Sequence, residues 1–250
     1  MNKVKKGISF GSVFNCELEE LNNLNNLDDL MIEVPAGQDK AVEFLEGLEV
    51  KYGIHYPSFT SYQQIGYDWS NKVDRKKIKE DFLTCVEKYR YAEYYLLHFP
   101  GNNLSNDKNI QELEYFLENL KSDMKEKSTL LVIENMSHFR VEDYEKIIKN
   151  TGVKLCLDLG HAHIIDEREV YQFFDRLANY IRVIHYYNTT NDKTNIQYGV
   201  HLPYQAFVEN GIDIARVNQL ISSISNEIYV INEQIGRRNI SCFREMEFDI

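Results

Sequence analysis

The chain has 250 residues, with a formal net charge of −11, 43% hydrophobic residues and 27% charged residues. Such a composition is ordinary for a globular domain and argues against a disordered chain. The acidic net charge repels phosphate backbones at long range, so it disfavours a nucleic-acid partner. We also expect no association with a membrane, because no stretch is long and apolar enough to span a bilayer.

The cysteines and the N-terminal sequence indicate the compartment. The four cysteines, Cys16, Cys85, Cys156 and Cys242, are scattered and form no CxxC pair. They suggest reduced thiols rather than a disulfide framework or a cysteine-based zinc site. The N-terminal sequence MNKVKKGISFGSVF is too polar for a secretion signal. Together these features predict a cytoplasmic protein.

Short β-rich segments alternate with longer charged segments of helical period along the chain. This pattern is typical of β/α units that build a parallel sheet. We therefore predict an α/β fold, a (β/α)8 TIM barrel, with a single domain over residues 1–250. The expected strands lie near Gly7–Gly11, Leu30–Val34, Lys51–His55, Tyr94–Phe99, Thr129–Glu134, Lys154–Asp158, Ile181–Tyr186 and Ile228–Glu233. The expected helices cover residues 16–27, 39–48, 74–90, 109–127, 141–150 and 167–180.

Helix boundaries and loops complete the expected organisation. Asp74 and Asn109 have the character of helix starts, and Gly152 that of a helix end. Two loops, Pro57–Val73 and Tyr187–Gly211, are longer than a barrel needs, and long loops at this rim are usually lids or substrate walls. The first of them is rich in aromatic residues and could equally be a dimer contact, so a homodimer stays open.

Six of the expected strands end in a residue that can bind a metal ion. These residues are His55, His98, Glu134, Asp158, His185 and Glu233, with Glu33 in LMIEVP as a seventh candidate. The carboxyl ends of barrel strands meet at one rim, where the active sites of such barrels lie. Ionisable groups buried together are costly unless a cation balances them. The set therefore predicts an enzyme with a metal centre, and no phosphate-loop, GxGxxG or GxSxG motif competes with it.

The donor types suggest which metal would bind. Carboxylates from Glu134, Asp158 and Glu233 with the imidazole of His185 form a mixed oxygen and nitrogen site. Such a site suits Mn²⁺, Co²⁺, Fe²⁺ or Zn²⁺ and leaves room for substrate or water. A second ion could be held by the remaining two histidines, His55 and His98, if Glu134 bridges. The alternative role for this pair is hydrogen bonding to substrate oxygens, so one ion or two are expected.

Two more histidines, His161 and His201, and Glu33 are further candidates for the pocket. His161 follows Asp158 by three residues and is expected to reach the substrate. His163 and His138 are expected at a helix start or on the surface. His201, in the long seventh loop, is either a substrate or metal contact or a structural residue. Glu33 either accepts a hydrogen bond from a sugar hydroxyl or is a salt-bridged carboxylate at the rim.

The order and spacing of several short motifs resemble the xylose isomerase-like TIM barrel superfamily over essentially the whole chain. The motifs are GISFG, GIHYP, LLHFPG, VIENM, CLDLGHAH, VIHYYN, GVHLPY and INEQ. This superfamily contains sugar isomerases and epimerases, and also the endonuclease IV class of apurinic-site nucleases, known as AP endonuclease family 2. The resemblance to its epimerase branch implies one divalent ion on Glu134, Asp158, His185 and Glu233. It also implies that the two glutamates exchange the substrate proton and that His161 contacts substrate oxygens.

The resemblance to the endonuclease IV branch implies more zinc. His55 and His98 would bind a second ion with Glu134 as the bridge, and a third would need His161 and an Asp-x-His pair. His201 matches the histidine of that pair, but Gly199 occupies the aspartate position. The third site is one ligand short, and this argues against DNA cleavage.

The leading hypothesis is therefore a metal-dependent isomerase or epimerase that acts on a small sugar or sugar-like hydroxycarbonyl compound, with Mn, Co or Zn. The alternative is an endonuclease IV-like zinc phosphodiesterase. A third hypothesis is an oxidative enzyme that modifies a peptide at paired iron.

Overall fold

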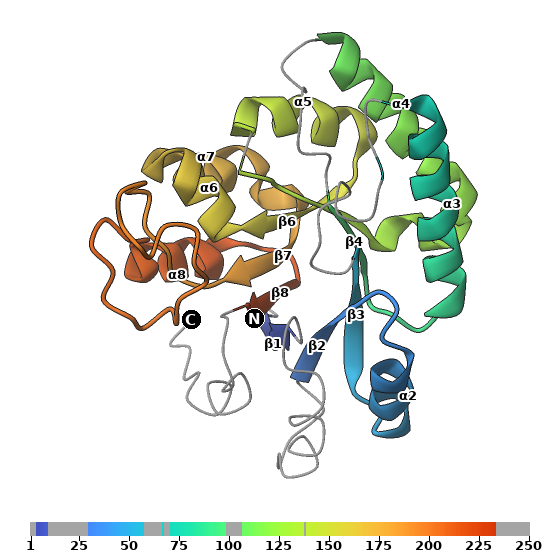
Figure 1. The fold of residues 1–250 in the computed structure, drawn as a ribbon, viewed down its shortest axis with the longest axis horizontal. Helices are drawn as coiled ribbons and strands as arrows, with labels where there is room; N and C mark the ends of the chain where they lie inside the picture. The colour runs from blue at the N-terminus through green and yellow to red at the C-terminus, as the bar shows by residue number, and fades with distance from the viewer. Residues whose placement is uncertain are drawn as a thin grey trace.

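The computed structural model describes residues 4–9, 30–57, 67, 71–98, 107–137 and 139–233. In it, eight parallel strands form a closed barrel, in chain order, with the last strand paired to the first (Figure 1). The predicted (β/α)8 TIM barrel is thus confirmed. The strands are β1 Val4–Ser9, β2 Leu30–Pro35, β3 Lys51–Tyr56, β4 Tyr95–His98, β5 Leu131–Glu134, β6 Lys154–Asp158, β7 Ile181–Tyr186 and β8 Ile228–Asn232.

Helices lie around the outside of these strands (Figure 1). They are α2 Asp39–Gly47, α3 Lys72–Lys88, α4 Asp107–Met124, α5 Val141–Thr151, α6 Leu159–Ile165, α7 Glu167–Leu177 and α8 Ile214–Ser223. Two 3₁₀ helices, η1 Lys125–Leu130 and η2 Ala178–Tyr180, precede β5 and β7. Within the described ranges, no helix has both the length and the apolar character that a membrane span requires.

Several expected boundaries shift in the structure. α3 begins two residues before Asp74, because the side chain of Asn71 accepts the Val73 N–H at 2.8 Å and caps the helix. α4 begins at Asp107 rather than at Asn109. Gly152 does end α5, with the positive φ of 66° that glycine adopts without strain. The expected helix at 16–27 and most of the aromatic loop lie outside the described residues.

Two helices, α6 and α8, were not expected. α6 has only 7 residues and starts directly from the end of β6, too short a segment for a helical period to stand out. α8 has 10 residues and follows the long seventh loop. Both are placed by their caps, since Asp158 accepts the His161 N–H and Asp213 accepts the Arg216 N–H at their N-termini.

The core has two shells because strand side chains alternate in direction. One shell packs between the strands and the helices, and it includes Ile54, Leu97 and Ile133. The other fills the barrel and consists of Met31, Tyr94, Leu96, Val132, Cys156, Val183, Tyr229 and Ile231. All of the barrel-filling side chains are at most 1% exposed, so the barrel is a packed core rather than a pore.

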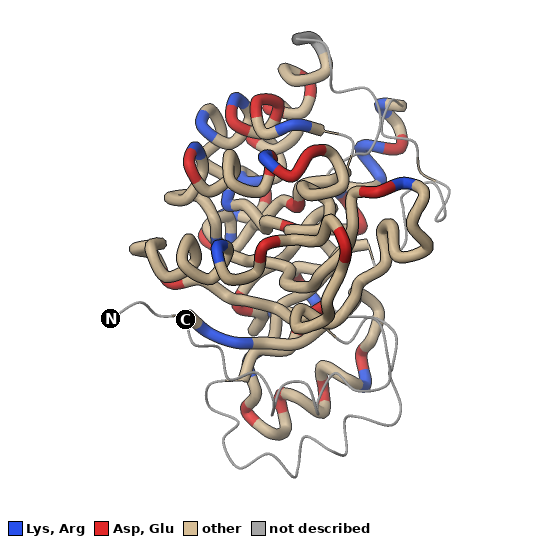
Figure 2. Tube along the Cα trace, turned by 90° about the vertical axis from the view of Figure 1, so that its left-hand side faces the viewer, with Lys and Arg blue, Asp and Glu red and all other residues tan. Residues whose placement is uncertain are grey.

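Charged residues of both signs follow one another along the outer helices (Figure 2). Some of them join neighbouring helices: Lys79 on α3 lies 2.7 Å from Asp123 on α4, and Arg176 on α7 lies 3.2 Å from Glu145 on α5. Exposed pairs of this kind contribute only about 0–1 kcal/mol each. The outer layer is therefore held mainly by its apolar contacts with the strands.

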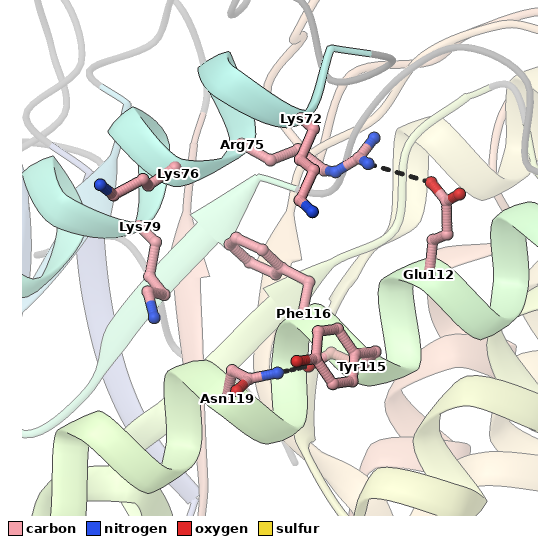
Figure 3. Close-up of a pocket in the computed structure, with 8 residues that line it drawn as sticks. All are labelled: Lys72, Arg75, Lys76, Lys79, Glu112, Tyr115, Phe116 and Asn119. Carbon is pink, nitrogen blue, oxygen red and sulfur yellow. Dashed lines mark hydrogen bonds and ion pairs between the residues drawn. The ribbon is translucent and has the colours of Figure 1, made fainter.

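A pocket of about 430 Å³ lies in this outer layer, between α3 and α4 (Figure 3). Its lining residues are Lys72, Arg75, Lys76, Lys79, Glu112, Tyr115, Phe116 and Asn119. Three of its four cations are already paired, because Arg75 lies 3.0 Å from Glu112, Lys79 contacts Asp123 and Lys76 lies 3.6 Å from Glu80. None of the metal-binding candidates from the strand ends lines this pocket, so it is not the predicted active site.

One strand glycine is required by close packing. A Cβ atom on Gly53 of β3 would lie 2.3–2.6 Å from the ring carbons of Tyr94, which is fully buried inside the barrel. We predict that Gly53→Ala lowers the free energy of unfolding by about 1–3 kcal/mol through overpacking. Urea denaturation of the purified variant measures the change.

Gly47→Ala is the matched control, because an added Cβ there would meet nothing within 4 Å. It should leave the stability unchanged or slightly raised. An equal loss in both variants would contradict the packing argument.

Candidate metal centre

The candidate residues form the top layer of the barrel interior. Apart from His55, which follows Gly53, each lies two positions after a residue that faces into the barrel, and successive residues of a strand alternate in direction. Glu134 thus follows the interior Val132, Asp158 follows Cys156, and His185 follows Val183. The same spacing relates the other candidates to the interior: Glu33 to Met31, His98 to Leu96 and Glu233 to Ile231. The structure therefore brings the strand-end residues together at one end of the barrel.

The imidazole of His185 is the point where the expected ligand set converges. Its Nδ1 lies 3.1 Å from Glu233 Oε2, 3.6 Å from Glu134 Oε1 and 3.6 Å from Asp158 Oδ2. Ligand atoms that each lie about 2.0–2.3 Å from a common ion are separated by distances of this order. His185 and Asp158 are 0% exposed and Glu134 is 2% exposed, so the cluster is shielded from water.

Among the described residues there are three overlapping groups in which the donor atoms lie within 4.8 Å of one another. They are Glu33 with His55, His185 and Glu233; His55 with His98 and Glu134; and Glu134 with Asp158 and His161. The set of Glu134, Asp158, His185 and Glu233 is not one of these groups as a whole. The three carboxylates of this set are instead neighbours of one atom, Nδ1 of His185.

Asp158 is oriented by hydrogen bonds to only one of its oxygens. Its Oδ1 accepts the backbone N–H of His161 at 2.7 Å and the hydroxyl of Tyr187 at 2.8 Å. Its Oδ2 is buried, has no hydrogen-bond partner and lies on the side of His185. The fold thus fixes the carboxylate with one oxygen used for structure and the other available.

Glu134 directs its two oxygens to different neighbours. Oε1 lies 3.6 Å from His185 Nδ1 and 3.4 Å from His161 Nδ1. Oε2 lies 3.1 Å from His98 Nε2 and 3.5 Å from His55 Nε2. A carboxylate between two sets of imidazoles has the geometry needed to bridge two cations.

Charge is balanced inside the cluster by proton-binding groups. Burial alone would raise the pKa of Glu134, but the imidazoles of His98 and His185 hold it well below its ordinary value. Burial would lower the pKa of His161, yet Asp158 and Glu134 raise it to about 10. The pKa of His98 lies below its ordinary value, because burial is the largest influence there. Glu134 is therefore ionised, and the proton on His161 balances part of its charge.

The donor chemistry fits a divalent metal ion. Among the described residues, Glu134 Oε2, Asp158 Oδ2 and His185 Nδ1 are buried atoms without a hydrogen-bond partner. A buried polar atom left without a partner costs about 1–3 kcal/mol, so their gathering at one place calls for a compensating ligand. Carboxylate oxygen with imidazole nitrogen is a common donor set for Mn, Co, Fe and Zn. A cation would also take over the role of the imidazole protons.

Two other histidines, His161 and His201, lie beside the cluster. His161, whose side chain is 22% exposed, has its Nδ1 2.9 Å from the Asn135 carbonyl oxygen at the edge of the cluster. His201 stacks on Tyr187 with ring centroids 3.8 Å apart, and its Nδ1 lies 2.9 Å from the Glu233 carbonyl oxygen. The long seventh loop is thus anchored beside the cluster.

The expected position of His163 was wrong, and that of His138 falls on an undescribed residue. His163 lies inside α6, is 1% exposed and has its Nε2 2.8 Å from the Asn210 carbonyl oxygen. Its buried position comes from the packing of α6 against the seventh loop, a contact between residues 47 positions apart that a local pattern does not indicate.

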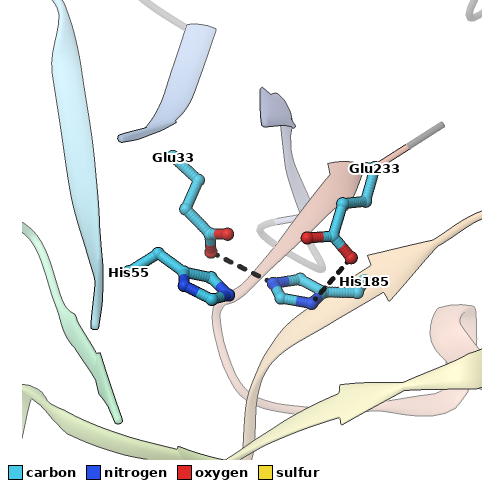
Figure 4. Close-up of side chains that lie close together, drawn as sticks. All are labelled: Glu33, His55, His185 and Glu233. Carbon is cyan, nitrogen blue, oxygen red and sulfur yellow. Dashed lines mark hydrogen bonds and ion pairs between the residues drawn. The ribbon is translucent and has the colours of Figure 1, made fainter. Parts of the chain in front are cut away.

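Glu33 lies deeper than a residue that meets substrate at the rim. It is 0% exposed, and its Oε2 lies 2.7 Å from the Tyr94 hydroxyl and 3.1 Å from His185 Nε2. Figure 4 shows Glu33 and Glu233 joined to the two different nitrogens of the His185 ring. The contact with His185 is an ion pair when the imidazole is protonated, and both expected roles of Glu33 stay predictions.

Sequence reasoning missed three residues that orient the cluster. The hydroxyl of Tyr94 donates to Glu33, and the hydroxyl of Tyr187 donates to Asp158. Each tyrosine is separated from a candidate histidine by an even number of residues, four for Tyr94 and His98 and two for Tyr187 and His185, so that both side chains of a pair face the same side of the strand. This even spacing is the sequence signal that could have identified the two tyrosines. No such signal identifies Asn135, because its role depends on the neighbouring strand.

The chain is similar to known proteins over most of its length. A family model described as xylose isomerase-like TIM barrel matches residues 24–238. No curated protein matches the sequence. A D-tagatose 3-epimerase-like protein of known structure superposes with a TM-score of 0.74 at 17% identity, over 97% of this chain and 95% of that chain.

Two further solved structures cover nearly the full length. An AP endonuclease of family 2 from Brucella melitensis has a TM-score of 0.68 at 11% identity, over 98% of this chain and 99% of that chain. A Thermus thermophilus protein soaked with ZnCl2 has a TM-score of 0.68 at 14% identity, over 97% of each chain. Identities this low show a shared fold and do not select one activity.

Asn135 joins the ends of β5 and β6 through two hydrogen bonds. Its buried side chain accepts the Asp158 N–H at 2.6 Å and donates to the Asp158 carbonyl at 3.0 Å. Asn135→Ala should lower the free energy of unfolding by about 1–3 kcal/mol, because it leaves these backbone groups unpaired. Urea denaturation measures the loss.

Asn150→Ala serves as the control, since its side chain makes an exposed bond of 2.7 Å to Glu114. We expect a change within about 0.5 kcal/mol there. Similar losses of unfolding free energy in the two variants would show that the hydrogen bonds between Asn135 and Asp158 contribute no more than an exposed hydrogen bond.

Proposed function

The chain belongs to the xylose isomerase-like TIM barrel family, and we propose that it is a divalent-metal-dependent isomerase or epimerase of a small sugar or sugar-like hydroxycarbonyl compound. The convergence of three carboxylates on one imidazole nitrogen carries this proposal. Glu134, Asp158 and Glu233 all approach His185 Nδ1 within 3.6 Å.

These four residues would hold one divalent ion, with Mn, Co or Zn as the candidates. Such an ion, when bound, polarises the carbonyl oxygen of the substrate and so acidifies the adjacent C–H bond. Buried surroundings strengthen this effect, because a low dielectric increases the interaction of charges. The orientation of Asp158 by Tyr187 and the His161 N–H keeps the donor oxygen in place.

The paired glutamates would perform the proton transfers. One carboxylate removes the proton from the carbon next to the carbonyl, and the C–H electron pair moves to form an enediolate. The other carboxyl group, in its protonated form, returns a proton. For epimerisation the proton goes to the opposite face of the same carbon; for isomerisation it goes to the former carbonyl carbon, and the hydroxyl proton moves from one substrate oxygen to the other. Burial would raise the pKa of Glu134, but the imidazoles of His98 and His185 hold it well below its ordinary value, so this carboxyl group is ionised.

His161 and His201 would contact substrate oxygens from the edge of the cluster. Their side chains are 22% and 23% exposed, more than the candidate ligands. Hydrogen bonds from imidazoles to hydroxyl groups would fix which carbon faces the carboxylates. The seventh loop, anchored through His201 to the carbonyl of Glu233, would form a wall of the substrate pocket.

A zinc-dependent phosphodiesterase is the second candidate, and the position of His55 and His98 favours it. Both imidazoles lie within 3.5 Å of Glu134 Oε2, so the residues of a second cation site stand beside the first. Two metal ions can clamp the attacking and leaving oxygens of a phosphodiester. Gly199 in place of an aspartate and the net charge of −11 oppose this function.

Metal content separates these functions. We predict that untagged protein contains one equivalent of Mn, Co or Zn per chain by elemental mass spectrometry. Two or three equivalents of zinc would instead support the phosphodiesterase, and two of iron an oxidative enzyme. Protein that takes up no divalent ion on reconstitution would overturn the metal centre.

The roles of the glutamates predict a loss of turnover in two variants. Glu134→Gln and Glu233→Gln should each lower the rate by at least about 10²–10⁴-fold, the usual contribution of a general acid or base. The assay follows conversion of ketoses and aldoses, with incorporation of solvent deuterium at the exchanged carbon.

Glu169→Gln is the matched control, because Glu169 is a 1% exposed carboxylate on α7 that binds the Val141 N–H instead. It should retain turnover. Full activity in both site variants would rule out proton exchange by this pair.

A further inference from the structure

A buried chain of contacts leads from the barrel interior to the candidate metal position. The Tyr94 hydroxyl lies 2.7 Å from Glu33 Oε2, and the same oxygen lies 3.1 Å from His185 Nε2. All three residues are 0% exposed. No water competes at such a depth, so each contact fixes the orientation of the next side chain.

Packing of neighbouring strands holds this chain of contacts in place. Glu33 on β2 stands opposite Gly53 on β3 in the parallel register. Gly53 has no side chain, and its place inside the barrel is filled by the ring of Tyr94, which a Cβ there would meet at 2.3 Å. The hydroxyl of Tyr94 thereby reaches Glu33.

The two nitrogens of His185 have different neighbours. Among the carboxylates of the described residues, Nε2 faces Glu33 alone, whereas Nδ1 faces Glu233, Glu134 and Asp158. A neutral imidazole carries its proton on one nitrogen and a lone pair on the other. When a cation among the candidate ligands needs the lone pair of Nδ1, the carboxylate at Nε2 accepts the hydrogen bond of the single remaining N–H.

We propose that Glu33 is a positioning residue that sets the tautomer and the ring orientation of His185 for metal binding, with Tyr94 as its support. A carboxylate that accepts the second N–H of a metal-binding histidine raises the basicity of the ligand and fixes its direction. Glu33 thus acts through His185 rather than on substrate. This inference rests on the metal centre of the proposed function.

Direct ligation by Glu33 is the competing role. Its Oε1 has no hydrogen-bond partner, and its donor atoms lie within 4.8 Å of those of His55, His185 and Glu233 (Figure 4). Its Oε2 is already shared between Tyr94 and His185, however. Positioning explains both of these contacts, whereas ligation by Glu33 explains neither.

Binding of Co²⁺ tests the proposal without an activity assay. The dissociation constant is measured by competition with a chromogenic chelator, and visible absorption of bound Co²⁺ reports its coordination. We expect Glu33→Gln to weaken Co²⁺ binding about 10–100-fold, with an unchanged number of ions per chain. Tyr94→Phe should weaken binding in the same direction by less, because Glu33 keeps its contact with His185.

Glu169→Gln is the control for the general effect of a buried carboxylate. It should lower thermal stability and leave the dissociation constant for Co²⁺ unchanged. Far-UV circular dichroism checks that each variant folds, and Tyr94→Phe provides the test if Glu33→Gln does not fold.

The outcomes separate the two proposals. Wild-type protein that binds no Co²⁺ would overturn the metal centre itself. Binding by wild-type protein with the same affinity in both Glu33→Gln and Tyr94→Phe would overturn only the positioning role. A drop of one in the number of bound ions in Glu33→Gln would show that Glu33 is a ligand instead.

Discussion

Buried charge at the end of a packed barrel is the constraint on which the rest of the site depends. Glu33, Glu134 and Asp158 are at most 2% exposed and lie directly above an apolar interior. Ionised carboxylates at such a depth are stable only with partners of opposite charge. The imidazoles provide these partners through protons, and a divalent cation would provide them more directly. Glu33 and Asp158 are each held by hydrogen bonds to one of their two oxygens.

The alternation of strand side chains converts this constraint into a defined geometry. Interior residues such as Val132 and Cys156 set the direction in which the residue two positions later must face. Parallel register then places His98 opposite Glu134 and Asp158 opposite His185 on adjacent strands. Rigid strands therefore deliver the donors, whereas loops such as the one anchored by His201 border them. This division suits a site whose metal is fixed and whose substrate is chosen by the surroundings.

The two candidate functions differ in the use of one residue. Glu134 faces His185 with one oxygen and the pair of His55 and His98 with the other. With a single ion, Glu134 is a ligand and proton acceptor, and the histidine pair contacts substrate. With two ions it is a bridge. Because both arrangements use the same side-chain positions, the number of bound ions decides the chemistry.

The sequence by itself determined the fold class and the set of candidate donors, because strand patterning and strand-end residue types are local properties. It did not determine where α3 and α4 begin, the burial of His163, or the short helix α6, which depend on caps and packing partners. Only the tertiary structure decided which atoms of the donors remain free. Glu33 and His185 are 152 residues apart, and closure of the barrel alone brings them to 3.1 Å. The orientation of each donor is a property of such long-range contacts, which no local pattern encodes.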